Sequence, residues 1–178
     1  MAGSAEAPAR DIARSAVLVL FVVFLGVALG AGLYESRVEV PQWIEQTDAG
    51  YRWNAEAARE ADTGRRFWAF VTTGPLTVLS LASLVLAWRS TGALRRWWLA
   101  AAGVSLADRV LTFSYFIPTM LVLMSDAGPD GQEAVDVALR WAALDWVRHG
   151  LTLAALLAAL RALTLMTDRT SAVAASVR

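Results

Sequence analysis

Four long runs of apolar residues dominate the pattern of this chain, at about residues 12–33, 67–88, 97–124 and 137–166. Each run reaches the length of about 20 residues that an α-helix needs to cross the hydrocarbon core of a bilayer. The first run exceeds the roughly 7–15 apolar residues of a signal-peptide core, so we expect it to be retained. The pattern predicts an all-α fold: an integral membrane four-helix bundle, in a single domain over residues 1–178.

The connections between these runs differ in length. The first, residues 34–66, is long and contains Pro41 and Trp43, and its Ala- and Glu-rich stretch 54–62 favours a short surface helix. We expect a frayed tail over residues 169–178. Gly26 and Gly30 form a small-xxx-small pair, which predicts a close helix contact in the first span.

Composition supports a membrane protein. The hydrophobic fraction is 57%, which is above that of an ordinary soluble domain. Sixteen basic and sixteen acidic residues cancel, so no global field points to nucleic acid. With no cysteine and a single histidine, the chain has no disulfide or thiolate site, and we expect no bound metal.

Four spans place both termini on one side of the membrane. Seven arginines lie in or beside the tails and the second connection, against six on the other side. Because arginine and lysine are enriched in cytoplasmic loops, this excess predicts a multi-pass protein of the cell (inner) membrane with cytoplasmic termini.

Polar residues gather on one face of each of the last two spans. At 100° per residue, one set falls within about 80° and the other within about 120°. A charge at the bilayer centre costs about 2.5–3.5 kcal/mol on insertion scales, so these faces should be buried against each other or against a cavity. The sets are Trp141, Asp145, Arg148, His149 and Thr152 on the fourth span, and Ser105, Asp108, Arg109, Thr112, Tyr115, Phe116 and Thr119 on the third.

The relative depth of these residues follows from the helical rise of about 1.5 Å per residue. Counted from the 125–136 connection, Asp145 should lie level with Phe116, and His149 level with Thr112. We expect a pocket that opens toward the first and third connections. Pro118 and Pro75 either kink their helices and open space here or are merely tolerated in the membrane.

The expected buried charges do not balance. Glu35, Asp108 and Asp145 face Arg109 and Arg148, so either one carboxyl or His149 must be protonated. A shared proton of this kind is what general acid–base catalysis requires. The alternative is that ion pairs between Asp108 and Arg148 and between Asp145 and Arg109 hold the helices together, with His149 a hydrogen-bonded core residue.

Three motifs together resemble the anthrone-oxygenase-like family of small four-helix membrane proteins. They are Tyr34-Glu35-x2-Val38-x2-Pro41-x-Trp43, Tyr115-Phe116-Ile117-Pro118, and Trp141-x3-Asp145-x2-Arg148. The chain departs from the family where Thr119-Met120 follows the proline in place of Arg-Asn, and where Asp145 replaces an asparagine. The resemblance covers about residues 15–165 and implies oxygenation of a polycyclic, polyketide-like hydroxyaromatic without metal, flavin or other cofactor.

The residues themselves suggest roles for such a reaction. Asp145 or His149 would remove a proton, and Arg148 would stabilise the resulting anion. The same groups would serve an isomerase or cyclase. Residues expected to contact substrate are Tyr34, Glu35, Trp43, Asp108, Arg109, Thr112, Tyr115, Phe116, Thr119 and Trp141.

Two other classes of function fit the sequence. In the first, the chain is a binding or accessory protein whose pocket holds a lipid, quinone or hydrophobic metabolite. In the second, membrane carboxylates couple transport to protons, which with four spans would call for a homo-oligomer. The partners we expect are a hydrophobic small-molecule substrate and membrane lipid, and no nucleic acid.

Overall fold

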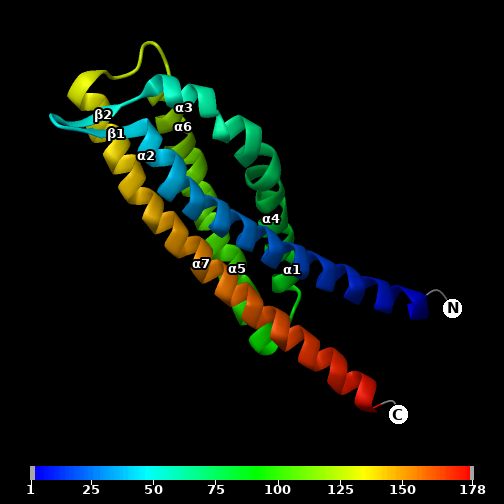
Figure 1. The fold of residues 1–178 in the computed structure, drawn as a ribbon. Coiled ribbons are helices and arrows are strands. Elements are labelled where there is room, and N and C mark those ends of the chain that lie inside the picture. Colours follow the sequence, from blue (N-terminus) through cyan, green and yellow to red (C-terminus); the bar gives the residue numbers. More distant parts are fainter. Residues whose placement is uncertain (1–2, 177–178) are drawn as a thin grey trace.

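The computed structural model describes residues 3–176, with side chains described from residue 12 to residue 168. Its helices form an up-and-down bundle in which both ends of the described chain lie together, opposite a small hairpin (Figure 1). Four helical stretches are long and apolar enough to cross a membrane: Ile12–Trp43, Gly64–Trp88, Gly92–Leu123 and Gly131–Asp168. The predicted all-α, multi-pass membrane fold is confirmed.

Three of the four stretches change helix type along their length. The first comprises α1 (Gly3–Tyr34), the π-helix η1 (Glu35–Glu39) and α2 (Val40–Trp43). The second joins η2 (Gly64–Thr73) to α4 (Gly74–Trp88), and the third joins α5 (Gly92–Leu111), η3 (Thr112–Phe116) and α6 (Ile117–Leu123). The fourth is the single helix α7 (Gly131–Ser176), which extends into the tail expected to fray over residues 169–178. The last two residues lie outside the described part.

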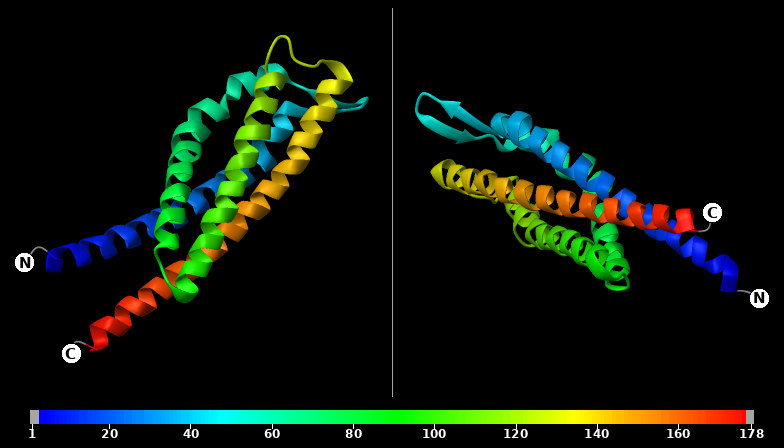
Figure 2. Two further views of the ribbon diagram at one scale, coloured as in Figure 1. Left: turned by 180° about the vertical axis from the view of Figure 1, so that it is seen from behind. Right: turned by 90° about the horizontal axis from the view of Figure 1, so that it is seen from below.

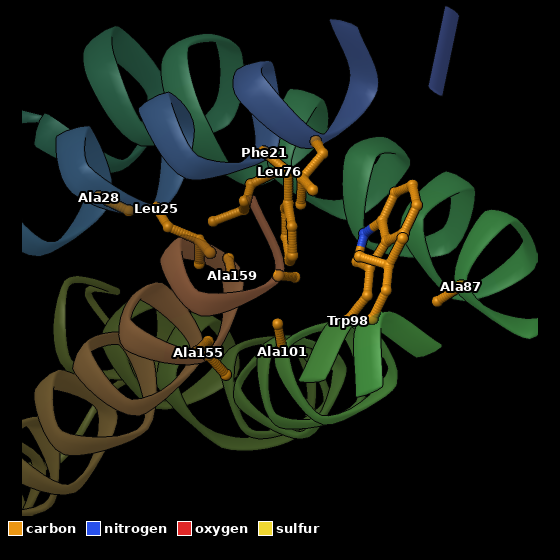
Figure 3. Close-up of a cluster of buried hydrophobic side chains, with 13 residues drawn as sticks. Phe21, Leu25, Ala28, Leu76, Ala87, Trp98, Ala101, Ala155 and Ala159 are labelled. Atoms are coloured by element: carbon orange, nitrogen blue, oxygen red, sulfur yellow. The ribbon is translucent and has the colours of Figure 1, made fainter. Parts of the chain in front are cut away.

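The half of the bundle near the termini is held by a continuous apolar core (Figure 3). Phe21 and Leu25 of α1 meet Leu76 of α4 and Trp98 of α5, all of them essentially inaccessible to solvent. Small side chains on α7 allow the other helices to approach it closely. These are Ala155, Ala158, Ala159 and Ala162.

The outward faces of the same helices carry large exposed apolar side chains. Val78 on α4 and Leu157 on α7 are 65% and 58% exposed. In water such surfaces would favour aggregation, whereas in a bilayer they contact acyl chains. The arrangement is therefore that of a bundle surrounded by lipid.

The close contact of α1 is made by a different glycine from the predicted pair. A Cβ on Gly26 or Gly30 would meet nothing within 4 Å, so the prediction for that pair is wrong. A Cβ on Gly32 would lie 2.8 Å from Cε1 of His149. The contact of α1 that needs a glycine is thus with an imidazole ring, not with the backbone of a neighbouring helix.

Each π-helix ends two residues before a proline. The residue preceding that proline donates the last hydrogen bond to the carbonyl five residues back: Val40 before Pro41, Gly74 before Pro75 and Ile117 before Pro118. A proline ring clashes with the carbonyl four residues back in an α-helix. The wider π turn accommodates that clash, so of the two alternatives left open for Pro75 and Pro118 the structure shows a local distortion, in the form of π-helices.

The long first connection folds into a hairpin and a short helix. The antiparallel strands β1 (Ile44–Thr47) and β2 (Gly50–Trp53) pair Ile44 with Trp53. The helix predicted over residues 54–62 is confirmed as α3 (Ala55–Ala61), with Asn54 accepting a capping bond from the Ala57 amide. The strands were not predicted. Trp53 Nε1 donates to the Leu123 carbonyl at 3.1 Å and so ties the hairpin to α6.

Candidate functional site

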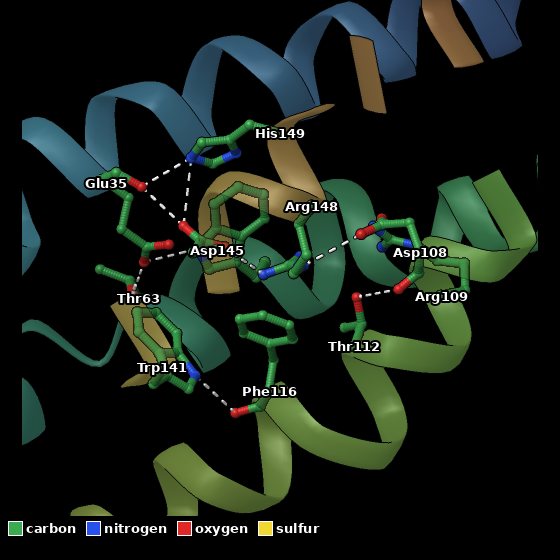
Figure 4. Close-up of polar contacts among 12 residues, drawn as sticks. Glu35, Thr63, Asp108, Arg109, Thr112, Phe116, Trp141, Asp145, Arg148 and His149 are labelled. Carbon is green, nitrogen blue, oxygen red and sulfur yellow. Dashed lines mark hydrogen bonds and ion pairs between the residues drawn. The ribbon is translucent and has the colours of Figure 1, made fainter. Parts of the chain in front are cut away.

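A chain of ion pairs and hydrogen bonds links α5, α7 and η1 (Figure 4). Arg109 pairs with the adjacent Asp108, and Arg148 Nε donates to Asp108 Oδ1 at 3.2 Å. Arg148 Nη1 also donates to Asp145 Oδ1 at 3.0 Å. The predicted inward-facing charge cluster is confirmed, including the Asp108–Arg148 pair. The expected Asp145–Arg109 pair is not formed, because Arg148 lies between the two aspartates and bonds to both.

The cluster ends at a serine that the sequence reasoning missed. Ser36 Oγ donates to Asp145 Oδ2 at 2.8 Å and lies 2.8 Å from His149 Nε2. Because a hydroxyl carries one proton, Ser36 then accepts from an Nε2–H of His149. His149 Nε2 is also 3.4 Å from Asp145 Oδ2. A single serine beside Glu35 gave no sequence signal of this contact.

The histidine ring is confined by its surroundings. It rests against Gly32 of α1, and Trp146 meets it edge to face with ring centroids 5.3 Å apart. The Arg37 guanidinium stacks over the indole ring of Trp146, 5.1 Å from the ring centre. His149 is 8% exposed, so its orientation is fixed by packing as well as by hydrogen bonds.

A second polar group surrounds Glu35 at the start of η1. Its Oε1 accepts from Thr63 Oγ1 at 2.7 Å and from Trp68 Nε1 at 2.9 Å. These two bonds join the first span to the start of the second. Both bonds reach one carboxylate oxygen, and no protein bond to the other oxygen is made by the described residues.

Aromatic side chains connect Arg148 to the third span. Its guanidinium lies 4.5 Å from the centre of the Phe116 ring, and Trp141 Nε1 donates to the Phe116 carbonyl at 3.2 Å. Phe116 therefore lies between residues 141 and 148 of α7. This confirms the predicted register, in which Phe116 is level with Asp145.

A cavity of about 740 Å³ lies beside these groups, toward the hairpin end of the bundle. Its size is that of a small-molecule site, and its walls are mostly apolar and aromatic. All three π-helical regions contribute to it. Glu35, Trp43, Trp68, Thr112, Phe116, Trp141 and Arg148 lie on its wall, and Arg59, Asp62 and Arg65 of the first connection lie at its polar rim.

The predicted site residues divide into two groups around this cavity. Six line it: Glu35, Trp43, Thr112, Phe116, Trp141 and Arg148. The other seven do not: Tyr34, Asp108, Arg109, Tyr115, Thr119, Asp145 and His149. Tyr34 faces outward and is 58% exposed. Asp108, Asp145 and His149 are buried behind Arg148, so among the predicted charged groups only Glu35 and Arg148 can touch a molecule in the cavity.

The arrangement supplies a carboxylate and a cation to one apolar cavity. Two carboxylates fix the Arg148 guanidinium through Nε and Nη1, which leaves Nη2 free of protein bonds among the described residues. Glu35 is held through one oxygen, so its second oxygen is available to take a proton. In the described part of the chain no three His, Asp or Glu side chains group as metal ligands do.

Comparisons with known proteins add no assignment. No protein-family model, no curated protein and no solved structure matches the chain. The function must therefore be argued from the cavity and the residues around it.

Proposed function

We propose that this protein is a membrane-embedded enzyme that binds a hydrophobic hydroxyaromatic molecule and removes a proton from it. The observation that carries the proposal is that Glu35 and Arg148 share the wall of one largely apolar cavity. An aromatic molecule fits beside Phe116, Trp68 and Trp141. Its ionisable oxygen or activated carbon would then lie beside the charged groups of Glu35 and Arg148, which line the cavity together with these aromatic rings.

Each group has a defined role in this reaction. Glu35 accepts the proton, since Thr63 and Trp68 orient its carboxylate through one oxygen. Arg148 donates to the anion that forms, and it needs no reorganisation because Asp108 and Asp145 already hold it. Asp145, Ser36 and His149 position Arg148 from behind and need not touch the substrate.

The resemblance to the anthrone-oxygenase-like family supports oxygenation as the overall reaction. The deprotonated carbon would reduce O2, and conversion of its CH2 group to a carbonyl consumes one O2 and releases one water. The substrate anion supplies the electrons, so the reaction balances without another reductant. Proton transfer without oxygen would instead give an isomerase or cyclase.

The test is turnover of 1,8-dihydroxyanthrone by the purified protein, followed by O2 uptake and by formation of the anthraquinone. We expect Glu35→Gln to lower turnover by about 10²-fold or more, the usual contribution of a general base. The amide oxygen can still accept from Thr63 and Trp68, so the melting temperature should stay close to wild type. Glu39→Gln, in the same π-helix but away from the cavity wall, is the matched control and should keep full activity.

A non-catalytic binding protein is the second candidate function. It is favoured by the observation that Asp145, Ser36 and His149 bond to one another, that Asp108 bonds to Arg109 and Arg148, and that none of these four residues lines the cavity. This function predicts that wild-type protein binds 1,8-dihydroxyanthraquinone but does not oxidise the anthrone above its spontaneous rate. If Glu35→Gln keeps full activity, Glu35 is not the base of the proposed reaction.

We also propose that the protein resides in the cell membrane with both termini in the cytoplasm, as the arginine distribution favours. Since the chain has no cysteine, single cysteines at Ser125 and Thr91 can report the topology. A membrane-impermeant maleimide added to intact cells should label the Ser125→Cys protein and not the Thr91→Cys protein. The reverse pattern would invert the orientation.

A further inference from the structure

One wall of the cavity is incomplete on the membrane side. Toward the termini α4 packs on α5, but toward the hairpin η2 makes at most marginal contact with η3 and α6. In Figure 1 and in the left view of Figure 2, the η2–α4 stretch bows away from the α5–η3–α6 stretch, and we call this separation the fork. Residues from both sides of the fork line the cavity.

The two edges of this fork have different surfaces. On the η2 side the cavity is lined by exposed small residues at every fifth position: Gly64, Ala69 and Gly74. On the other side it is lined by a stripe of large apolar residues at every fourth position: Phe113, Ile117 and Leu121. Phe113 and Leu121 are 51% and 61% exposed although they line the cavity, so the cavity is open along this wall.

The opening lies within the membrane-spanning part of the molecule. Its edges belong to the candidate spans Gly64–Trp88 and Gly92–Leu123, and most of its edge residues carry no polar side chain. It therefore faces hydrocarbon, whereas Glu35 and Arg148 form the polar part of the cavity wall. A molecule that occupies the cavity meets charge on one side and lipid on the other.

We propose that the ligand is a hydroxyaromatic that carries a hydrocarbon chain, and that this chain leaves the cavity between η2 and the η3–α6 stretch into the bilayer. The proposal rests on the proposed function for the aromatic head, which lies against Arg148 and Glu35. The hydrocarbon chain of the ligand needs no pocket in the protein, because it stays in the lipid from which the ligand enters. Ala69, opposite the large apolar stripe, then determines whether a chain can pass.

The experiment compares 1,8-dihydroxyanthraquinone with the same compound bearing a dodecyl chain at carbon 3. Binding to wild-type, Ala69→Phe and Val78→Phe proteins is measured by calorimetry in detergent micelles, with each Kd corrected for partition of the probe into micelles. Val78 is exposed on α4 outside the cavity, so its variant controls for an added aromatic ring on the lipid face. Melting temperatures are recorded for all three proteins.

Wild type and Val78→Phe should bind both probes with Kd values within about threefold of each other. Ala69→Phe should weaken binding of the dodecyl probe at least about tenfold more than it weakens binding of the unsubstituted probe. Rejection of the dodecyl probe by wild type would show a closed cavity and overturn the proposal while leaving the proposed function intact. Equal weakening of both probes by Ala69→Phe would also overturn it. Failure of wild type to bind either probe would contradict the proposed function itself.

Discussion

The two ends of the bundle are built on different principles. Near the termini, α1, α4, α5 and α7 pack through an apolar core with small alanines on α7. Near the hairpin, three of the four stretches contain π-helices, and a cavity and an ionic cluster occupy the space that side chains fill at the other end. The end near the termini holds the helices together, whereas at the hairpin end the helices are held apart and Glu35 and Arg148 line a cavity.

The difference shows how a small membrane bundle can make room for a site without long insertions. Three prolines, each preceded by a π turn, distort the helices on the hairpin side. The buried charges are accommodated there because they bond to one another. Removing a charge at the hairpin end should destabilise the protein because a buried partner charge is left unpaired. Adding bulk near the termini should destabilise it because the apolar core has no room.

The largest expected effect is at Arg148. Arg148→Met would leave Asp108 and Asp145 buried without the cation that bridges them, and breaking a buried pair typically costs about 3–5 kcal/mol. The free energy of unfolding in mixed micelles measures this loss. Arg148→Lys keeps the charge but not the planar fork, so it should fall between wild type and Arg148→Met. Unchanged stability in Arg148→Met would mean that the ionic cluster does not hold α5 to α7.

A smaller effect is expected in the alanine core. Ala159→Leu adds three carbons where no solvent reaches, and overpacking of this kind costs about 1–3 kcal/mol. Ala154→Leu makes the same change on the exposed face of the same helix and should be near neutral. Thermal unfolding of the two variants side by side gives the comparison. Equal stability of both would contradict the close packing of α7.

The contact between α1 and His149 can be tested with two glycines. Gly30→Ala meets nothing and should stabilise α1 slightly, since alanine is favoured over glycine in helices by up to about 1 kcal/mol. Gly32→Ala would push against the imidazole ring, so it should lose this gain and be less stable than Gly30→Ala by about 1–2 kcal/mol. If Gly32→Ala is as stable as Gly30→Ala, the ring is not confined as described.

The smallest effect concerns the hairpin outside the membrane. Hydrogen bonds from Arg52 and Asn54 hold the pKa of Glu45 below its ordinary value. The unfolded hairpin therefore binds the proton more tightly, and the contribution of Glu45 is present at neutral pH and lost as the pH falls below about 4.5. The protection factors of the β1 and β2 amides, which correct for the intrinsic pH dependence of exchange, should fall in that range. The same fall in Glu45→Gln would assign the effect to another group.

The sequence predicted best what depends on helical periodicity. Of the twelve residues predicted on the buried polar faces of the last two long stretches, nine are buried and Tyr115, Thr119 and Arg148 are half-buried. Ser114, Trp146 and Val147, predicted to lie outside these faces, are exposed. These assignments require only a regular helix and the cost of charge in lipid. The antiparallel register, with Phe116 beside Trp141 and Arg148, followed in the same way.

The sequence could not separate the residues that line the cavity from those behind it. Asp145 and Arg148 share a helix face, and only the position of Asp108 and Ser36 in neighbouring helices makes Arg148 the one that reaches the cavity. The bonds from Thr63 and Trp68 to Glu35 depend on how the first connection folds back. Periodicity carries no information on such contacts, because they join distant segments without a repeating pattern.

The central claim is that a hydroxyaromatic molecule binds in the cavity between Glu35 and Arg148. A structure of the protein with 1,8-dihydroxyanthraquinone tests it most directly. We predict the ring system beside Phe116 and Trp141, with one of its oxygens about 2.7–3.2 Å from an Arg148 nitrogen. A cavity filled only by a phospholipid acyl chain, with the anthraquinone bound elsewhere or not at all, would contradict the account.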